Sequence, residues 1–298
     1  MSIQIGAFFP TNDMPADRVA IRDWAQAAEA IGFDFVVVSD HVLGADWSAL
    51  PDFDESLVKA NGSYDVDDSF HEIFVTMAYI AAVTERVGLA SGVLILPQRQ
   101  TSLVAKKAAQ LDVVSGGRLR LGIGVGWNPV EYEALGQDWR VRGRRQAEQI
   151  ELMNQLWTNR TVTFDGEFDR VNHAGIKPLP IQQPIPIWFG GGAEPVLRRA
   201  AKYGQGWIPL QPQFRPDKLE GPLERLHSYL KAEGREPSTF GLDGWVVSSI
   251  GGPDEWQTEA ERWVTVGATH VTFYTSKLGI GGVEQQIEAM NQFYDVVR

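Results

Sequence analysis

The pair Asp40-His41 is the arrangement in this sequence best suited to acid–base chemistry. It follows Phe35 to Val38, a short apolar run that predicts a buried strand. An imidazole changes charge near neutral pH, and a nearby carboxylate can fix its tautomer and raise its pKa. Adjacent strand residues point to opposite faces, so the two side chains need not touch. We predict Asp40 and His41 to be catalytic, with Asp40 orienting the network around the histidine.

A glycine-rich stretch, Gly116 to Pro129, is the second candidate. Apolar residues alternate with small or polar ones from Leu119 to Val125, which is typical of a strand. Its glycines leave room close to the backbone, either for a flat ligand or for a tightly packed helix. The spacing is not the dinucleotide-binding fingerprint, because no spaced glycine opens a helix after the strand.

The run Gly190-Gly191-Gly192 joins a predicted strand to a predicted helix. Exposed N–H groups and the helix dipole at such a junction favour an anion, above all a phosphate. A tight turn without a ligand is the alternative interpretation. We predict a phosphate site here, because barrels often hold phosphate on their later loops.

Composition excludes several classes of function. The chain has no cysteine, which excludes disulfides, thiolate metal sites and a cysteine nucleophile. Its net charge of −11 argues against a nucleic-acid partner. The first residues lack the basic region of a signal peptide, and no apolar run approaches the ~20 residues of a membrane span. No histidine spacing suggests a metal site. We therefore expect a cytoplasmic protein that acts on small molecules.

Strands and helices alternate along the whole chain. Eight strand–helix units in one run predict a parallel (β/α)8 TIM barrel, a single domain over residues 1–298, with sites at the C-terminal ends of the strands. The predicted strands are Ile3 to Phe9, Phe35 to Val38, Val87 to Leu96, Leu119 to Val125, Ile185 to Phe189, Gly206 to Leu210, Leu242 to Ile250 and His270 to Tyr274.

Two segments depart from this alternation and predict insertions at the mouth of the barrel. The irregular segment Val42 to Asp68 has the length of a lid or binding loop. The segment Thr161 to Val171 alternates around Asp165-Gly166, which predicts a β-hairpin with a two-residue turn.

Several of these motifs occur together, in order, in one known family. The chain resembles the bacterial luciferase-like monooxygenase superfamily, and more closely its actinobacterial branch that uses the deazaflavin coenzyme F420. The resemblance runs from Ile3 to about Leu210. The motifs that carry it are Val36 to His41, Ser91 to Leu94, Gly117 to Gly126, the hairpin Phe164 to Phe168, Pro186 to Gly192 and Gly204 to Trp207.

The resemblance implies a coenzyme lying across the C-terminal mouth of the barrel. His41 would lie near the reactive carbon of its ring. Gly92-Val93 matches a bulge, often a non-proline cis peptide, that supports the ring from behind. Gly190 to Gly192 match the turn that holds the coenzyme phosphate. The residues implied to bind the coenzyme are Asp40, Gly92, Val93, Val125, Gly126, Asn128, Gly190, Gly191 and Gly192.

The sequence departs from the sugar-phosphate dehydrogenases of this family at two places. They carry a glutamate where Trp127 aligns, and a lysine where this chain has Gln211 to Gln213. These differences argue against a sugar-phosphate substrate. We predict an apolar or aromatic substrate pocket formed by Trp47, Trp127, Trp139 and Gln211.

Three functions remain open at this point. The first is an F420-dependent oxidoreductase that transfers a hydride to or from an organic substrate with an activated C=C, C=O or C=N bond. The second is an FMN-dependent monooxygenase supplied with reduced flavin by a separate reductase. The third is a barrel that binds a coenzyme without turning it over. The resemblance also implies a homodimer.

Overall fold

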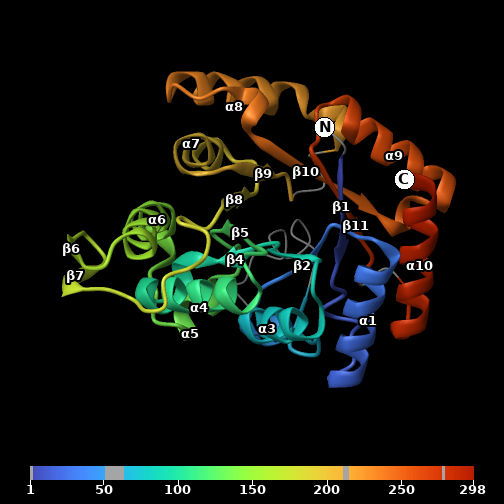
Figure 1. Cartoon of the computed structure of the whole chain (residues 1–298), viewed down its shortest axis with the longest axis horizontal. Helices are drawn as coiled ribbons and strands as arrows, with labels where there is room; N and C mark the ends of the chain where they lie inside the picture. The colour runs from blue at the N-terminus through green and yellow to red at the C-terminus, as the bar shows by residue number, and fades with distance from the viewer. Residues whose placement is uncertain (1–2, 51–63, 211–214, 277–278) are drawn as a thin grey trace.

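The computed structural model of this chain describes residues 3–50, 64–210, 215–276 and 279–298. Parallel strands form a closed barrel (Figure 1), because the first and last parts of the sheet meet where β3 pairs with β5. β3 and β4 are two parts of one interrupted strand, so the predicted (β/α)8 fold is confirmed. The strands are Gln4–Phe8 (β1), Phe35–Val38 (β2), Gly88–Ser91 (β3), Leu94–Ile95 (β4), Leu119–Gly124 (β5), Ile187–Gly190 (β8), Gly206–Ile208 (β9), Gly241–Val247 (β10) and His270–Tyr274 (β11).

Helices surround the barrel, and Figure 1 shows α1 and α10, from opposite ends of the chain, side by side. Among the described residues, no helix is long and apolar enough to cross a membrane. The helices are Arg18–Ile31 (α1), Ile73–Val83 (α3), Thr101–Val114 (α4), Pro129–Ala134 (α5), Arg142–Thr158 (α6), Glu194–Tyr203 (α7), Glu220–Ala232 (α8), Pro253–Thr265 (α9) and Gly282–Val297 (α10).

The third strand of the barrel is broken at Gly92-Val93, whereas the sequence predicted one strand from Val87 to Leu96. The peptide bond between Gly92 and Val93 is cis, as the family resemblance implied. A side chain at Gly92 would collide with Val37 on the neighbouring strand, which explains the glycine. The two halves keep separate partners, because β3 pairs with β2 and with the start of β5, while β4 pairs with its end.

The predicted hairpin forms, from Val162–Asp165 (β6) and Arg170–Ala174 (β7), but its turn differs from the prediction. Asp165 pairs with Arg170, so residues 166–169 form the loop and a two-residue turn is wrong. The carboxylate of Glu148 on α6 accepts the backbone N–H groups of residues 167, 168 and 169. This contact from another element outweighs the local turn preference of Asp-Gly.

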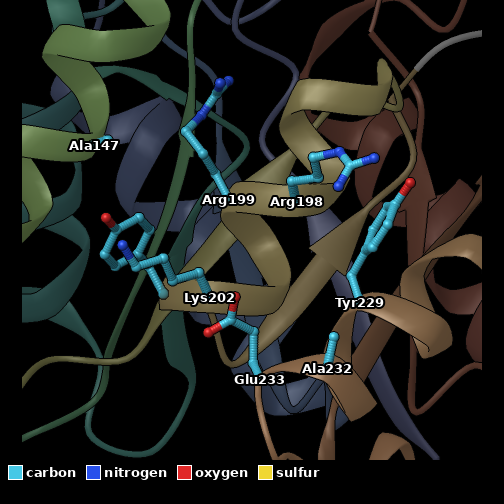
Figure 2. Close-up of a pocket in the computed structure, with 8 residues that line it drawn as sticks. Ala147, Arg198, Arg199, Lys202, Tyr229, Ala232 and Glu233 are labelled. Atoms are coloured by element: carbon cyan, nitrogen blue, oxygen red, sulfur yellow. The ribbon is translucent and has the colours of Figure 1, made fainter.

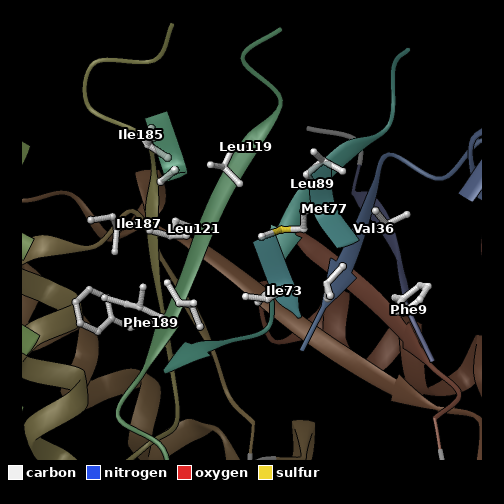
Figure 3. Close-up of a cluster of buried hydrophobic side chains, with 14 of the residues drawn as sticks. Phe9, Val36, Ile73, Met77, Leu89, Leu119, Leu121, Ile185, Ile187 and Phe189 are labelled. Carbon is white, nitrogen blue, oxygen red and sulfur yellow. The ribbon is translucent and has the colours of Figure 1, made fainter. Parts of the chain in front are cut away.

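The main core lies between the barrel and the helices. Alternate residues of each strand face outward into it, and Figure 3 shows Leu119 and Leu121 projecting from β5 beside Ile187 and Phe189 of β8. Their side chains are almost fully buried. At roughly 25 cal/mol per Å² of apolar surface, this layer supplies the largest favourable contribution to folding.

The inward-facing residues near the start of the strands fill the floor of the barrel. The guanidinium of Arg120 lies 4.3 Å from the ring centres of both Phe35 and Trp188. It also forms a buried ion pair with Asp243, at 2.9 Å. Side chains at Gly206 and at two other glycines would collide with these rings, so small residues on the remaining strands make room for the large ones.

Candidate active site

His41 lies at the mouth of the barrel, just after β2. Its Nδ1 atom is 3.2 Å from Oε2 of Glu131, the third residue of α5. The side chain of His41 is 15% exposed and that of Glu131 is fully buried. Among the described residues, no group forms a hydrogen bond with the other ring nitrogen, Nε2. A carboxylate at Nδ1 favours the tautomer with its proton there, which leaves Nε2 able to accept a proton.

Glu131 accepts several hydrogen bonds besides the one from His41. Its Oε1 accepts the N–H groups of Val42 at 2.5 Å and Leu43 at 3.3 Å, and its Oε2 accepts Nε2 of Gln98 at 3.2 Å. Burial by itself raises the pKa of Glu131, but the contacts with His41, Val42 and Gln98 outweigh it and lower the pKa. Glu131 is therefore an anion that both orients the histidine and fixes the start of the loop after it.

Local sequence explains why α5 presents Glu131 to the mouth. Asn128 caps the helix, its Oδ1 accepting the N–H of Val130 at 2.9 Å, and Pro129 occupies the first helical position. The amide of Asn128 also donates to the hydroxyl of Tyr64 at 2.8 Å. Asn128, predicted to bind the coenzyme, is fully buried and positions α5; its contact with a coenzyme stays a prediction.

The carboxylate of Asp40 forms no hydrogen bond with His41 among the described residues, which fits the expectation that adjacent strand residues need not touch. This carboxylate accepts the N–H of Ile95 at 2.9 Å and Nη2 of Arg99 at 2.5 Å. Burial raises the pKa of Asp40, and the positive charge of Arg99 opposes this shift. Asp40 thus ties the end of β2 to β4, and it positions His41 only through the backbone. Any direct catalytic role stays a prediction.

Aromatic side chains from several segments gather around His41. We call His41, Trp47, Tyr64, Phe70 and Trp127 the aromatic cluster. The His41 ring centre lies 4.0 Å from that of Tyr64, 4.9 Å from Phe70 and 6.2 Å from Trp127. Trp47 stacks on Trp127 at 5.8 Å, and its indole N–H donates to the backbone oxygen of Tyr64 at 2.6 Å. Two of the predicted pocket residues therefore lie beside the histidine.

The other two predicted pocket residues are not part of the aromatic cluster as described. Trp139 packs on Tyr132, with ring centres 5.1 Å apart, and under the guanidinium of Arg142 at 3.6 Å. Gln211 lies outside the residues that the structure describes. The participation of both in a substrate pocket stays a prediction.

Glycines at the ends of β5 and β8 make room for Val93. A Cβ atom on Gly124 would lie 2.6 Å from Cγ2 of Val93, and one on Gly190 would lie 2.7 Å from its Cγ1. Gly126 has a φ of +66°, which favours glycine. Of the predicted coenzyme residues, Gly190 thus lies against Val93, as does Gly124, which was not among them.

The turn after β8 differs in one respect from the predicted phosphate site. The N–H of Gly191 donates to the oxygen of Ile208 at 3.0 Å, so this group is not free for a ligand. Gly191 has a φ of +95°, and no atom of the described residues lies within 4 Å of a Cβ atom placed there. No side chain caps α7 at Ala193. The open space at Gly191 and this uncapped helix start fit an anion.

Sequence reasoning missed Glu131, and it included Gln98 and Arg99 only as part of a strand-end segment, Leu96 to Arg99, without a role for either. One signal existed for Glu131: an Asn-Pro start followed by an acidic residue marks the first turn of a helix, here directly after the glycine-rich strand. The first helical turn after a barrel strand lies at the mouth. Arg99 and Gln98 follow β4 and gave no comparable signal.

The sequence also has matches among known proteins. Residues 4–291 match the family model of the luciferase-like monooxygenases. The chain belongs to this family. The relatives of this chain include an F420-dependent enzyme and an FMNH2-dependent enzyme.

Three relatives illustrate this range. An uncharacterized protein of Mycobacterium tuberculosis is 33% identical over 235 residues, which are 76% of this chain and 78% of the relative. The F420-dependent hydroxymycolic acid dehydrogenase of the same species is 27% identical over 89% of this chain and 68% of its own. The FMNH2-dependent dimethylsulfone monooxygenase of Pseudomonas putida is 29% identical over 62% of this chain and 47% of its own.

Solved structures of the luciferase-like family share the fold. The monooxygenase RslO1 from Streptomyces bottropensis has a TM-score of 0.78 and 18% identity, over 98% of both chains. An F420-dependent secondary alcohol dehydrogenase, solved with an F420-acetone adduct, has a TM-score of 0.77 and 19% identity over the full length of both.

Proposed function

We propose that this protein is a coenzyme F420-dependent oxidoreductase that transfers a hydride between the deazaflavin and an apolar or aromatic organic substrate. The observation that carries the proposal is the His41–Glu131 pair, which lies beside the glycine-lined strand ends and within the aromatic cluster. The F420-dependent hydroxymycolic acid dehydrogenase, which matches 89% of this chain, supports the choice of coenzyme.

The residues present fit a flat coenzyme with an anionic side chain. Gly124 and Gly190 lack side chains that would collide with Val93, so Val93 can occupy the position predicted to support the ring. The open turn at Gly191 and the uncapped start of α7 suit the phosphate. The residues that would hold the coenzyme are Gly92, Val93, Val125, Gly126, Gly190, Gly191 and Gly192. When bound, the deazaflavin ring supplies or accepts the hydride.

His41 would move the proton that accompanies the hydride. With Nδ1 facing Glu131, its Nε2 is the nitrogen able to donate a proton to a reduced substrate or accept one from an alcohol. The Glu131 carboxylate faces Nδ1 and so fixes the orientation of the ring at the mouth. Asp40 keeps the end of β2 in place through its bonds to Ile95 and Arg99.

Trp47 and Trp127 would form part of the substrate site. The stacked pair presents apolar area beside His41, and the indole N–H of Trp47 is already bonded to Tyr64. This chemistry favours an apolar or aromatic compound over a sugar phosphate, which requires cationic groups. The activated bond of the substrate, C=C, C=O or C=N, would lie between the coenzyme ring and His41.

The second candidate function is an FMN-dependent monooxygenase supplied with reduced flavin by a separate reductase. The similarity to the FMNH2-dependent dimethylsulfone monooxygenase supports it. In that case His41 would assist the reaction of reduced flavin with oxygen. Deazaflavin reacts poorly with oxygen, because a carbon replaces the reactive ring nitrogen, so oxygen dependence separates the two functions.

Fluorescence titrations of the purified protein with F420 and with FMN test the proposal. We expect tight binding of F420, weak binding of FMN and anaerobic turnover of reducible unsaturated or aromatic compounds. Replacing His41 by Ala should lower kcat by a factor of about 10² or more while sparing coenzyme binding. Preference for FMN together with oxygen-dependent turnover would contradict the proposal. Sedimentation of the same sample tests the expected homodimer.

A further inference from the structure

Three side chains in the first turns of α6 carry buried donor groups without an acceptor. They are Nε of Arg142, Nε of Arg145 and Nε2 of Gln146, and none has a hydrogen-bond partner within the described part of the chain. Gln146 is only 1% exposed. Most buried polar groups in proteins have a hydrogen-bond partner, and one without a partner destabilises the fold, so these three groups call for an explanation. All three are donors, so the missing partner is an acceptor.

Arg199 of α7 brings a further guanidinium to the same place. Its Nε donates to Oε1 of Gln146 at 2.9 Å, and its Nη1 would lie 3.1 Å from a Cβ atom on Gly143. Burial lowers the pKa of Arg199, and the nearby positive charge of Arg142 lowers it further. Two like charges therefore face each other between α6 and α7.

Two neighbouring arginines on the same helices, unlike this group, form ion pairs with glutamates. Arg144 pairs with Glu167 at 2.7 Å, and Arg198 pairs with Glu194 at 3.0 Å. Figure 2 shows that Arg198 extends towards Tyr229, whereas Arg199 leaves α7 in another direction. Arg142, Arg145 and Arg199 have no carboxylate within 4.0 Å among the described residues.

This group of cations adjoins the mouth of the barrel. The hydroxyl of Tyr132 donates to the backbone oxygen of Val125, at the end of β5, at 2.7 Å. The positive charges of Arg142 and Arg145 both act on Tyr132. On the other side, Arg199 belongs to the helix that follows the Gly190 turn, and arginine side chains on a helix lean towards its N-terminus. Arg199 therefore lies between α6 and α7, the helices that follow the paired strands β5 and β8, while Nη2 of Arg145 donates to the backbone oxygen of Arg99, after β4, at 3.3 Å.

We propose that Arg142, Arg145, Gln146 and Arg199 form a binding site for the anionic side chain of the coenzyme, through its phosphate or a carboxylate. This inference rests on the proposed function. The chain has a net charge of −11 and many carboxylates, yet in the part that the structure describes none lies within 4.0 Å of Arg142, Arg145 or Arg199, and Arg142 and Arg145 donate only to backbone oxygens. An anion would accept the unpartnered N–H groups and offset the repulsion between Arg142 and Arg199. In this arrangement Trp139 holds the Arg142 guanidinium by stacking.

The test compares ligands that share a ring but differ in charge. Dissociation constants are measured by fluorescence for F420 and for its phosphate-free precursor FO, with wild type, Arg142→Gln and Arg199→Gln. We expect F420 to lose about tenfold or more in affinity in each variant and FO to be unaffected, because a charge-assisted hydrogen bond is lost only for the anion. Arg199→Lys, which keeps the charge, should restore part of the loss.

Matched controls use the neutralised neighbours. Arg144→Gln and Arg198→Gln remove a charge from the same helices and should leave both dissociation constants unchanged. F420 lacking its glutamates distinguishes the two anions. If Arg199→Gln weakens binding of this compound as much as that of F420, the arginines bind the phosphate. If Arg199→Gln no longer weakens binding, they bind the carboxylates. Equal weakening of F420 and FO would overturn the inference, since it would show a merely structural role, and so would no weakening at all.

The same variants separate this inference from the proposed function. If the protein prefers FMN, the choice of coenzyme is wrong, and FMN is then compared with riboflavin in place of F420 and FO. Selective loss of FMN affinity in Arg142→Gln and Arg199→Gln would still support the anion site. Failure to bind any of the four compounds would contradict both.

Discussion

The imidazole of His41 is held by Glu131, a residue 90 positions further along the chain, through a contact of 3.2 Å between Nδ1 and Oε2. Glu131 also accepts the N–H groups of Val42 and Leu43, so it fixes the backbone on which the histidine is carried as well as the ring itself. The orientation of the ring and the position of its backbone therefore depend on the same carboxylate.

Replacing Glu131 by Gln should uncouple catalysis from coenzyme binding. The amide keeps the shape of the side chain but removes the negative charge that faces Nδ1 of His41. We expect kcat to fall by a factor of about 10², in the range typical of lost general acid–base assistance. Glu133→Gln, an exposed change on the same helix, is the control. A normal kcat in Glu131→Gln, with an unaltered pH profile, would show that the pair has no part in turnover.

The Glu131 carboxylate should also make stability depend on pH. Its pKa is lowered in the folded protein from the ordinary value of 4.5, so the ionised form favours folding. This contribution is present above that value and is lost as the pH falls through the lower, folded-state pKa. The free energy of unfolding of wild type should exceed that of Glu131→Gln at pH 6, and the difference should shrink in strongly acidic solution. Urea denaturation at a series of pH values measures it.

Asp40→Asn should destabilise the protein, because it leaves the Arg99 guanidinium buried without its carboxylate. Breaking a buried pair from one side typically costs about 3–5 kcal/mol in the free energy of unfolding. The control, Asp165→Asn, breaks the ion pair with Arg170. The side chains of Asp165 and Arg170 are 77% and 81% exposed, so the free energy of unfolding should fall by less than about 1 kcal/mol. Equal losses in the two variants, by denaturant unfolding, would contradict a structural role for Asp40.

The place of His41 could be predicted from the sequence, whereas its partner could not. A short apolar strand ending in Asp-His puts the histidine at the mouth of any barrel built from such units. The carboxylate beside it in the sequence instead faces Ile95 and Arg99, because side chains at adjacent positions diverge. Glu131 and His41 come together only in the folded barrel, and no local sequence pattern predicts contacts between such distant residues.

Gly190→Ala should disturb the mouth without affecting the rest of the barrel. The added Cβ would lie 2.6 Å from Cδ1 of Leu210 and 2.7 Å from Cγ1 of Val93. Leu210 can rotate away, but branched Val93 is held near its backbone, so we expect a loss of about 1–3 kcal/mol in stability and weaker coenzyme binding. In Gly221→Ala on α8 the nearest atom is 3.6 Å away, and no such loss should occur. Calorimetry and coenzyme titration check both variants.

The fold was predictable because its strands and helices leave regular patterns, and the exceptions have tertiary causes. The break at Gly92-Val93 was marked by a glycine inside a strand, a known sign of a bulge. The loop of the hairpin was not predictable, since Glu148 organises it from a different helix. The surroundings of Arg199 were not predictable either, because they depend on α6 packing beside α7.

The filled floor of the barrel determines where ligands can enter and leave. Arg120, enclosed by Phe35 and Trp188 and paired with Asp243, closes the end opposite His41. As far as the described residues show, a ligand therefore enters and leaves the barrel at the end that carries His41. When two ligands bind through this same end, the ligand that binds deeper must bind first and dissociate last. The order of binding and release therefore follows the depth of the two binding sites.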